Sequence, residues 1–168
     1  MSVPAGASAP TPLPLGQALI VTIGVIVAVA GFVALGAALH VVPLYAGFLL
    51  LWAWSALHAL SLKALPAALA GALTGAALSF TLQAGAAMAS PALIALALLL
   101  MLGAVFMVVA GRAALLCNQS TMLFITVLNA PLLQAGEDFR AVTLAIVLGA
   151  VWFGSVAWVV GRLAPTPG

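Results

Sequence analysis

The chain has 168 residues, of which 67% are hydrophobic and only 4% are charged. Soluble domains carry about 25% charged residues, so four Lys and Arg with two Asp and Glu cannot cover a water-facing surface. This composition excludes an ordinary soluble domain and predicts an all-α, polytopic membrane protein whose apolar surface faces the lipid bilayer. Because the net charge is only +2 and no basic cluster exists, we expect no nucleic-acid partner.

Residues 1–16 are rich in proline and small residues, which predicts a disordered leader. The apolar segment after them is too long for the core of a signal peptide, so we expect it to be retained as a helix. Six transmembrane helices of about 20 residues each are expected within a domain of residues 17–162, followed by a tail of residues 163–168. The predicted spans are 17–39, 44–62, 66–83, 91–111, 113–133 and 140–161.

The few charges favour six spans over five. With the N-terminus inside, the cytoplasmic loops and tail hold three of the four basic residues, which are Lys63, Arg112 and Arg162. Both acids and Arg140 then lie on the opposite side, as the positive-inside rule requires. We therefore expect a multi-pass protein of a bacterial inner membrane with both ends in the cytoplasm. The alternative is five spans, with segment 113–133 buried or re-entrant.

Small residues follow one face of the third predicted helix at four-residue spacing: Ala67, Gly71, Gly75 and Ser79. In lipid, such a stripe lets two helix backbones approach closely, so it predicts a packing seam within the chain or between protomers. The sixth predicted helix has a similar stripe that Phe153 interrupts. Because each half would contain three helices, this pattern suggests an inverted three-plus-three repeat, as in many transporters.

The most polar membrane segment is the fifth predicted helix, where Asn118, Thr121 and Asn129 fall on one face and Thr126 lies nearby. Asparagine facing lipid is costly, so this face should point inward. It could line a pathway for a substrate or ion. It could equally form interhelical hydrogen bonds, each worth about 0.6–2 kcal/mol.

The second predicted helix places Trp54, His58 and Ser61 at a spacing that keeps them on one face. His58 is the one ionisable side chain expected inside a span, where it could relay protons or act as a gate. The alternative is a neutral histidine near the interface that binds a backbone carbonyl. No catalytic set is visible and Cys117 is the only cysteine, so we expect neither an enzyme, a cofactor nor a metal site.

The order of features resembles a known membrane unit. Pro43-Leu44-Tyr45-Ala46-Gly47-Phe48, then Lys63, the Gly71–Gly75 pair and Arg140 resemble the six-helix unit of the fusaric-acid-resistance and aromatic-acid exporter superfamily. The chain is also similar to a six-span bacterial inner-membrane family of unknown function with the same order of Ala-Gly-Phe, Leu-Lys-Ala-Leu and Gly. The likeness covers about residues 39–162. The exporters' arginine before a Gly-Thr pair has no counterpart at 68–72.

The resemblance implies a transport-type, oligomeric membrane unit. Together with the polar fifth helix, it leads us to expect a small transporter or channel subunit for a small solute or ion, working as a homo-oligomer. The alternative is a non-transporting accessory, assembly or scaffold protein of the membrane.

Overall fold

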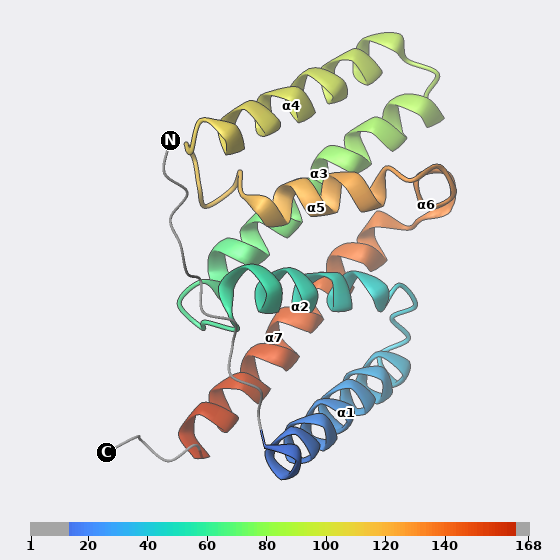
Figure 1. Cartoon of the computed structure of the whole chain (residues 1–168). Coiled ribbons are helices and arrows are strands. Elements are labelled where there is room, and N and C mark those ends of the chain that lie inside the picture. The colour runs from blue at the N-terminus through green and yellow to red at the C-terminus, as the bar shows by residue number, and fades with distance from the viewer. Residues whose placement is uncertain (1–13, 164–168) are drawn as a thin grey trace, which may run out of the picture.

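The computed structural model describes residues 14–163, and within them it is entirely helical, with no strand (Figure 1). Most of the predicted leader, at 1–13, and of the predicted tail, at 164–168, lies outside the described residues. The all-α prediction is therefore confirmed for the described part of the chain. The helices are α1 (Leu15–Ala38), α2 (Tyr45–His58), α3 (Leu65–Ala87), α4 (Pro91–Val109), α5 (Gln119–Leu128), α6 (Pro131–Gly136) and α7 (Phe139–Leu163).

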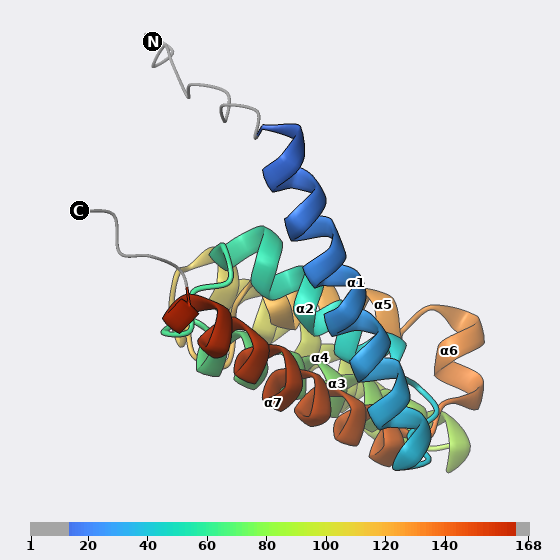
Figure 2. The ribbon, with the colours of Figure 1, turned by 90° about the horizontal axis from the view of Figure 1, so that it is seen from below.

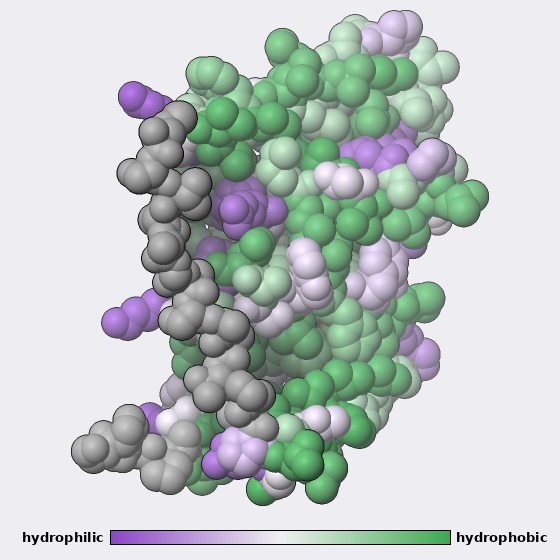
Figure 3. All heavy atoms as spheres, in the orientation of Figure 1, coloured by the Kyte–Doolittle hydropathy of each residue, from purple (hydrophilic) through white to green (hydrophobic). Residues whose placement is uncertain are grey.

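Four of these helices, α1, α3, α4 and α7, are long and apolar enough to cross a membrane. They contain 24, 23, 19 and 25 residues, and each coincides within a few residues with a predicted span. Hydrophobic residues cover most of the face in Figure 3, where isolated hydrophilic groups project at the left edge. The described chain thus presents the apolar exterior that a bilayer requires.

The helix predicted at 44–62 is shorter than expected. α2 has 14 residues, a length of about 21 Å at 1.5 Å per residue. It stops at His58 because Ala59 and Leu60 adopt left-handed conformations, with φ of 47° and 57°. His58 is thus the last residue of α2, and the helix does not continue to Leu62 as predicted.

The prediction of one continuous helix over 113–133 is also wrong. Residues 110–118 form turns, α5 has only 10 residues, and α6 has 6. Asn118 begins α5 as its N-cap, and Asn129 ends it as its C-cap. Ala130 is extended, with ψ of 133°, because the residue before a proline avoids the helical region. Pro131 then opens α6.

In Figure 1 the long helices α3, α4 and α7 slope in the same sense and the short helices α2 and α5 lie obliquely across them, while Figure 2 shows α1 inclined to α7. α3 and α7 run in opposite directions, since Leu65 lies against Gly154 and Phe80 lies 5.8 Å from Phe139 between ring centres. α3 and α5 run in the same direction, because Asn118 contacts the start of α3 and Asn129 contacts Ser79 further along. The α5–α6 segment therefore follows α3 from one end of the molecule to the other.

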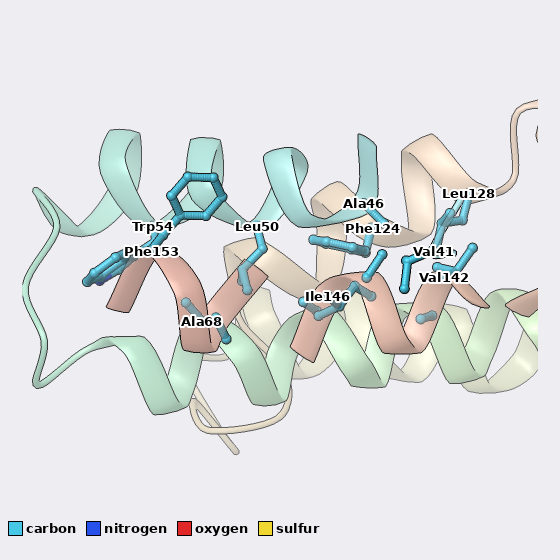
Figure 4. Close-up of a cluster of buried hydrophobic side chains, with 14 of the residues drawn as sticks. Val41, Ala46, Leu50, Trp54, Ala68, Phe124, Leu128, Val142, Ile146 and Phe153 are labelled. Carbon is cyan, nitrogen blue, oxygen red and sulfur yellow. The ribbon is translucent and has the colours of Figure 1, made fainter. Parts of the chain in front are cut away.

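The core lies where α2 and α5 meet α3 and α7 (Figure 4). Leu50 from α2, Phe124 from α5 and Ile146 from α7 are fully buried there. The backbones of α2 and α7 approach each other closely, since a Cβ added to Gly149 would lie 2.8 Å from the Cα of Gly47. The side chains that fill this core are mainly apolar.

A fixed spacing relates the two halves of the chain. α2 and α5 begin at Tyr45 and Gln119, which are 74 positions apart, and α3 and α7 begin at Leu65 and Phe139, again 74 apart. Four buried residues of α2 fall on buried residues of α5 at this spacing: Ala46/Ser120, Gly47/Thr121, Leu50/Phe124 and Trp54/Leu128. The buried positions 68, 71, 72, 75, 76 and 79 of α3 coincide in the same way with 142, 145, 146, 149, 150 and 153 of α7.

The charges separate between the two ends of the helices. The turn before α3, the connection from α4 to α5 and the end of α7 lie together at the left of Figure 1, and they carry Lys63, Arg112 and Arg162. The segment from α6 to the start of α7 lies at the right end and carries Glu137, Asp138 and Arg140. One end of the helices is therefore basic, and the opposite end holds both acids.

Candidate functional site at the break between α5 and α6

The small residues of α3 form the surface on which α5 lies. A Cβ added to Gly75 would lie 2.7 Å from the Cβ of Phe124 and 2.8 Å from the carbonyl oxygen of Thr121. A Cβ on Gly71 would overlap the side-chain amide of Asn118. Together with Ala67 and Ser79, these glycines let the polar backbone ends of α5 approach α3 directly.

Asn118 holds the start of α5 in place. Its Oδ1 accepts hydrogen bonds from the backbone N–H groups of Ser120 (2.9 Å) and Thr121 (3.3 Å), while its Nδ2 donates to the carbonyl oxygen of Ala67 on α3 (2.8 Å). Nδ2 also reaches the carbonyls of the preceding turn, Ala114 and Leu115. The amide is thus fully occupied as a helix cap and as a link to α3.

The two threonines of α5 point in different directions. Thr121 is fully buried, accepts a hydrogen bond from the backbone N–H of Asn118 and donates to the carbonyl of Leu116. Thr126 is exposed and donates to the carbonyl of Met122 in its own helix. Thr126, which the sequence grouped with the candidate pathway as a nearby polar residue, therefore lies on the exposed side of α5.

Asn129 lies at the opposite end of α5, beside a second amide. Its Nδ2 donates to the hydroxyl of Ser79 (2.9 Å) and to the carbonyl of Ile125. Gln134, from α6, donates through Nε2 to the backbone carbonyl of the same Ser79 (3.1 Å). Gln83 of α3 continues this contact by donating to the carbonyls of Gln134 and Glu137. Three side-chain amides thus gather around the break in the helix.

Two oxygens at this break are buried and have no hydrogen-bond partner among the described residues: Asn129 Oδ1 and Gln134 Oε1. Buried polar atoms normally have a partner, so these two are available to one. The C-terminal end of α5 adds the partial negative charge of its free carbonyls. The break therefore presents two unpartnered hydrogen-bond acceptors, which are the groups that a hydrogen-bond donor or a small cation would contact.

The sequence missed Gln134 and Ser79 as members of this polar group. Ser79 was assigned to the packing stripe, and Gln134 was placed just beyond the fifth helix. Their signal was the Pro131 that follows Asn129 and Ala130, because a proline there interrupts the helix and leaves polar groups to be satisfied.

The three candidate residues near the end of α2 form a separate group. Trp54 is buried, and its indole N–H donates to the carbonyl of Ser61 across the turn (2.8 Å), while the Ser61 side chain is exposed. His58 is half-buried, and its Nε2 has no hydrogen-bond partner among the described residues. This group lies at the basic end of the molecule, whereas Asn129 lies toward the acidic end, so the two do not form one site.

No group of three His, Cys, Asp or Glu residues within 14–163 could hold a metal ion. No family model, curated protein or solved structure matches the chain.

Proposed function

We propose that the chain is a small membrane transporter or channel subunit for a small solute or ion, built as an inverted repeat with six membrane crossings and both ends in the cytoplasm. The observation that carries the proposal is the break between α5 and α6, where Asn129 and Gln134 present unpartnered buried oxygens. Irregular backbone at membrane depth is tolerated where it is buried in protein or lines a cavity.

The paired spacing of 74 positions supports the repeat. α3 and α7 run in opposite directions, and each receives a short partner helix that runs along it: α5 along α3, and α2 along α7. The α3–α5 pair and the α7–α2 pair therefore have the same arrangement, but the helices of one pair run in the opposite direction to those of the other. In the proposed orientation α1, α3 and the α5–α6 segment run outward, and α2, α4 and α7 run inward.

The lengths and positions of the two short helices, α2 and α5, support the proposal of transport. α2 and α5 contain 14 and 10 residues, and they occupy corresponding positions in the two halves. Short or interrupted helices in corresponding positions of an inverted repeat typically mark the binding site of a transporter. Their buried faces meet in the apolar core, so a solute would pass only after the halves move, as in alternating access.

The acceptors at the break favour certain solutes. Amide and backbone oxygens accept hydrogen bonds from N–H or O–H groups and also coordinate Na⁺ through their lone pairs. An anion would be repelled there. We therefore propose a monovalent cation or a small neutral solute with N–H or O–H donors as the transported species.

The alternative function, a non-transporting scaffold or assembly protein, is favoured by Asn118. Its amide is fully engaged between α5 and α3, so this part of the predicted pathway is sealed by protein. A scaffold needs no solute route, and its unpartnered amides would be satisfied by fixed waters.

Cysteine labelling tests the six-crossing orientation. Cys117 is the only cysteine, so a Cys117→Ser chain provides a background without native thiols. In intact cells, a membrane-impermeant maleimide should label a cysteine at Met88, which lies in the exposed turn between α3 and α4, and should not label one at Ser61 before permeabilisation. Labelling of both or neither position in intact cells would contradict the proposed crossing of α3.

A flux assay tests transport itself. From a panel of Na⁺, small amides, polyols and small organic anions, the protein in liposomes should carry Na⁺ or at least one amide or polyol, and it should not carry the anions. Asn129→Leu and Gln134→Met should each lower that flux about tenfold, because each removes an acceptor worth roughly 1.4 kcal/mol in the transition state. Thr126→Val, on the exposed face of the same helix, should leave it unchanged. Folded protein that moves none of these solutes would support the scaffold.

A further inference from the structure

Two grooves lie between α3 and α7, one toward each end of the helices. The outer groove, of about 700 Å³, lies between the second half of α3 and the start of α7 and includes Phe80 and Arg140. The inner groove, of about 760 Å³, lies between the start of α3 and the end of α7 and includes Leu69 and Trp158. Both volumes fall in the range of small-molecule sites, and the grooves are open on one side.

The two grooves are built from equivalent positions. Three pairs of lining residues differ by 74 positions between α7 and α3: Phe139/Leu65, Arg140/Pro66 and Thr143/Leu69. The lining positions 76, 77 and 80 of α3 correspond in the same way to 150, 151 and 154 of α7. The shape therefore recurs at both ends of the crossing, while the chemistry of its side chains differs.

The inner groove has an apolar floor and a basic mouth. Its lining includes Leu62, which directly precedes Lys63 in the exposed turn before α3. The guanidinium of Arg162 lies over the ring of Trp158, with its Cζ 4.0 Å from the ring centre, and Trp158 itself lines the groove. No acidic residue is present at this end of the described chain, because Glu137 and Asp138 are both at the other end.

We propose that the inner groove binds an anionic phospholipid. One acyl chain lies between α3 and α7 against the apolar floor, and the phosphate and headgroup lie between Lys63 and Arg162. Basic pockets between membrane helices on the cytoplasmic side are suited to anionic headgroups, and Trp158 fits the interfacial belt. The site goes beyond the proposed transport function and stands whether or not the chain moves a solute.

The outer groove is the natural comparison. It carries Arg140, but Asp138 accepts a hydrogen bond from the Arg140 backbone N–H, and Glu137 is adjacent in sequence. Two acids beside one base cancel the attraction for an anion. We therefore expect the outer groove to hold acyl chains without selecting an anionic headgroup.

Native mass spectrometry of the full-length protein in detergent tests this site, with phosphatidylglycerol and phosphatidylcholine of identical acyl chains as probes. The wild-type protein should bind phosphatidylglycerol in preference to phosphatidylcholine. Lys63→Gln and Arg162→Gln should each weaken that binding about fivefold, because one basic residue near a membrane surface contributes about 1 kcal/mol and 1.4 kcal/mol is a factor of ten. Arg112→Gln is the matched control and should have no effect, because Arg112 is at the same end but lies in the connection between α4 and α5, whereas Lys63 follows the lining residue Leu62 and Arg162 stacks on the lining residue Trp158.

Substitutions that fill one groove or the other distinguish binding of an acyl chain in the groove from attraction of the headgroup by charge alone. Val151→Trp places an indole in the inner groove and should abolish the preference for phosphatidylglycerol, whereas Ala77→Trp fills the equivalent position of the outer groove and should preserve it. Equal binding of both lipids by the wild type, or equal effects of the Lys63, Arg162 and Arg112 variants, would overturn the proposal. A lipid-free dimer that Val151→Trp dissociates would show instead that a second copy of the chain covers this face.

Discussion

Replacing Gly75 with leucine is expected to destabilise the folded chain by about 3 kcal/mol, at the upper end of the usual cost of overpacking. A Cβ at this position would already lie 2.7 Å from the Cβ of Phe124 and 2.8 Å from the carbonyl oxygen of Thr121. Neither atom is the flexible end of a side chain, so α5 would have to move away from α3. Denaturation in mixed micelles, followed by circular dichroism, measures the free energy of unfolding.

Gly103 provides the matched control. It lies in the middle of α4, and a Cβ added there would meet nothing within 4 Å. Gly103→Leu should therefore be neutral or slightly stabilising, because leucine is the better helix former. Gly149→Leu should resemble Gly75→Leu, since its added Cβ would meet the Gly47 backbone on α2. Equal stability of the Gly75 and Gly103 variants would refute the close approach of α5 to α3.

Replacing Asn118 with alanine should cost about 2 kcal/mol of folding free energy, because it removes both a helix cap and a link between helices. Asn118→Ser retains an oxygen that can cap α5 but loses the bond from Nδ2 to the Ala67 carbonyl. We expect it to cost about 1 kcal/mol, the net value of one hydrogen bond. The same micelle denaturation measures both variants.

Gln119→Ala is the control for Asn118, because Gln119 is the adjacent, exposed first residue of α5. It should change stability by less than about 0.5 kcal/mol. Transport by the Asn118→Ser protein should remain normal at temperatures where it is folded, since the Asn118 amide caps α5 and links it to α3 and does not contact the solute. A selective loss of flux in a fully stable Asn118→Ser protein would place this residue in the solute route after all.

The sequence predicted the long helices well because their signal is strong and local. Each is a run of apolar residues long enough to cross a bilayer, bounded by proline, by a charged residue or by the chain turn at His40. The apolar runs and the residues that bound them therefore located α1, α3, α4 and α7 to within a few residues. The small-residue spacing also identified the face of α3 that α5 covers, although it could not name the partner helix.

The fifth predicted helix is a segment whose structure the sequence pattern did not predict correctly. Segment 113–133 has the length of a span and carries no charged residue, so the pattern predicted one span with both asparagines inside it. In fact Asn118 and Asn129 are the caps that begin and end α5. An asparagine can either join a polar stripe or terminate a helix, and only the tertiary contact with Ala67 or Ser79 selects between these outcomes. Thr126 belongs to the same polar segment, but it is exposed and donates a hydrogen bond within its own helix.

The fixed spacing of 74 positions has a consequence for how the chain enters the membrane. Lys63 precedes α3, and the equivalent position before α7 is Glu137. If the halves are inverted copies, as proposed, one turn carries a cation on the cytoplasmic side and its copy carries an acid on the opposite side. That change of sign would direct two similar three-helix units to insert in opposite senses. The basic residue then stands only in the turn on the cytoplasmic side, where the positive-inside rule favours it, and the equivalent turn lacks it.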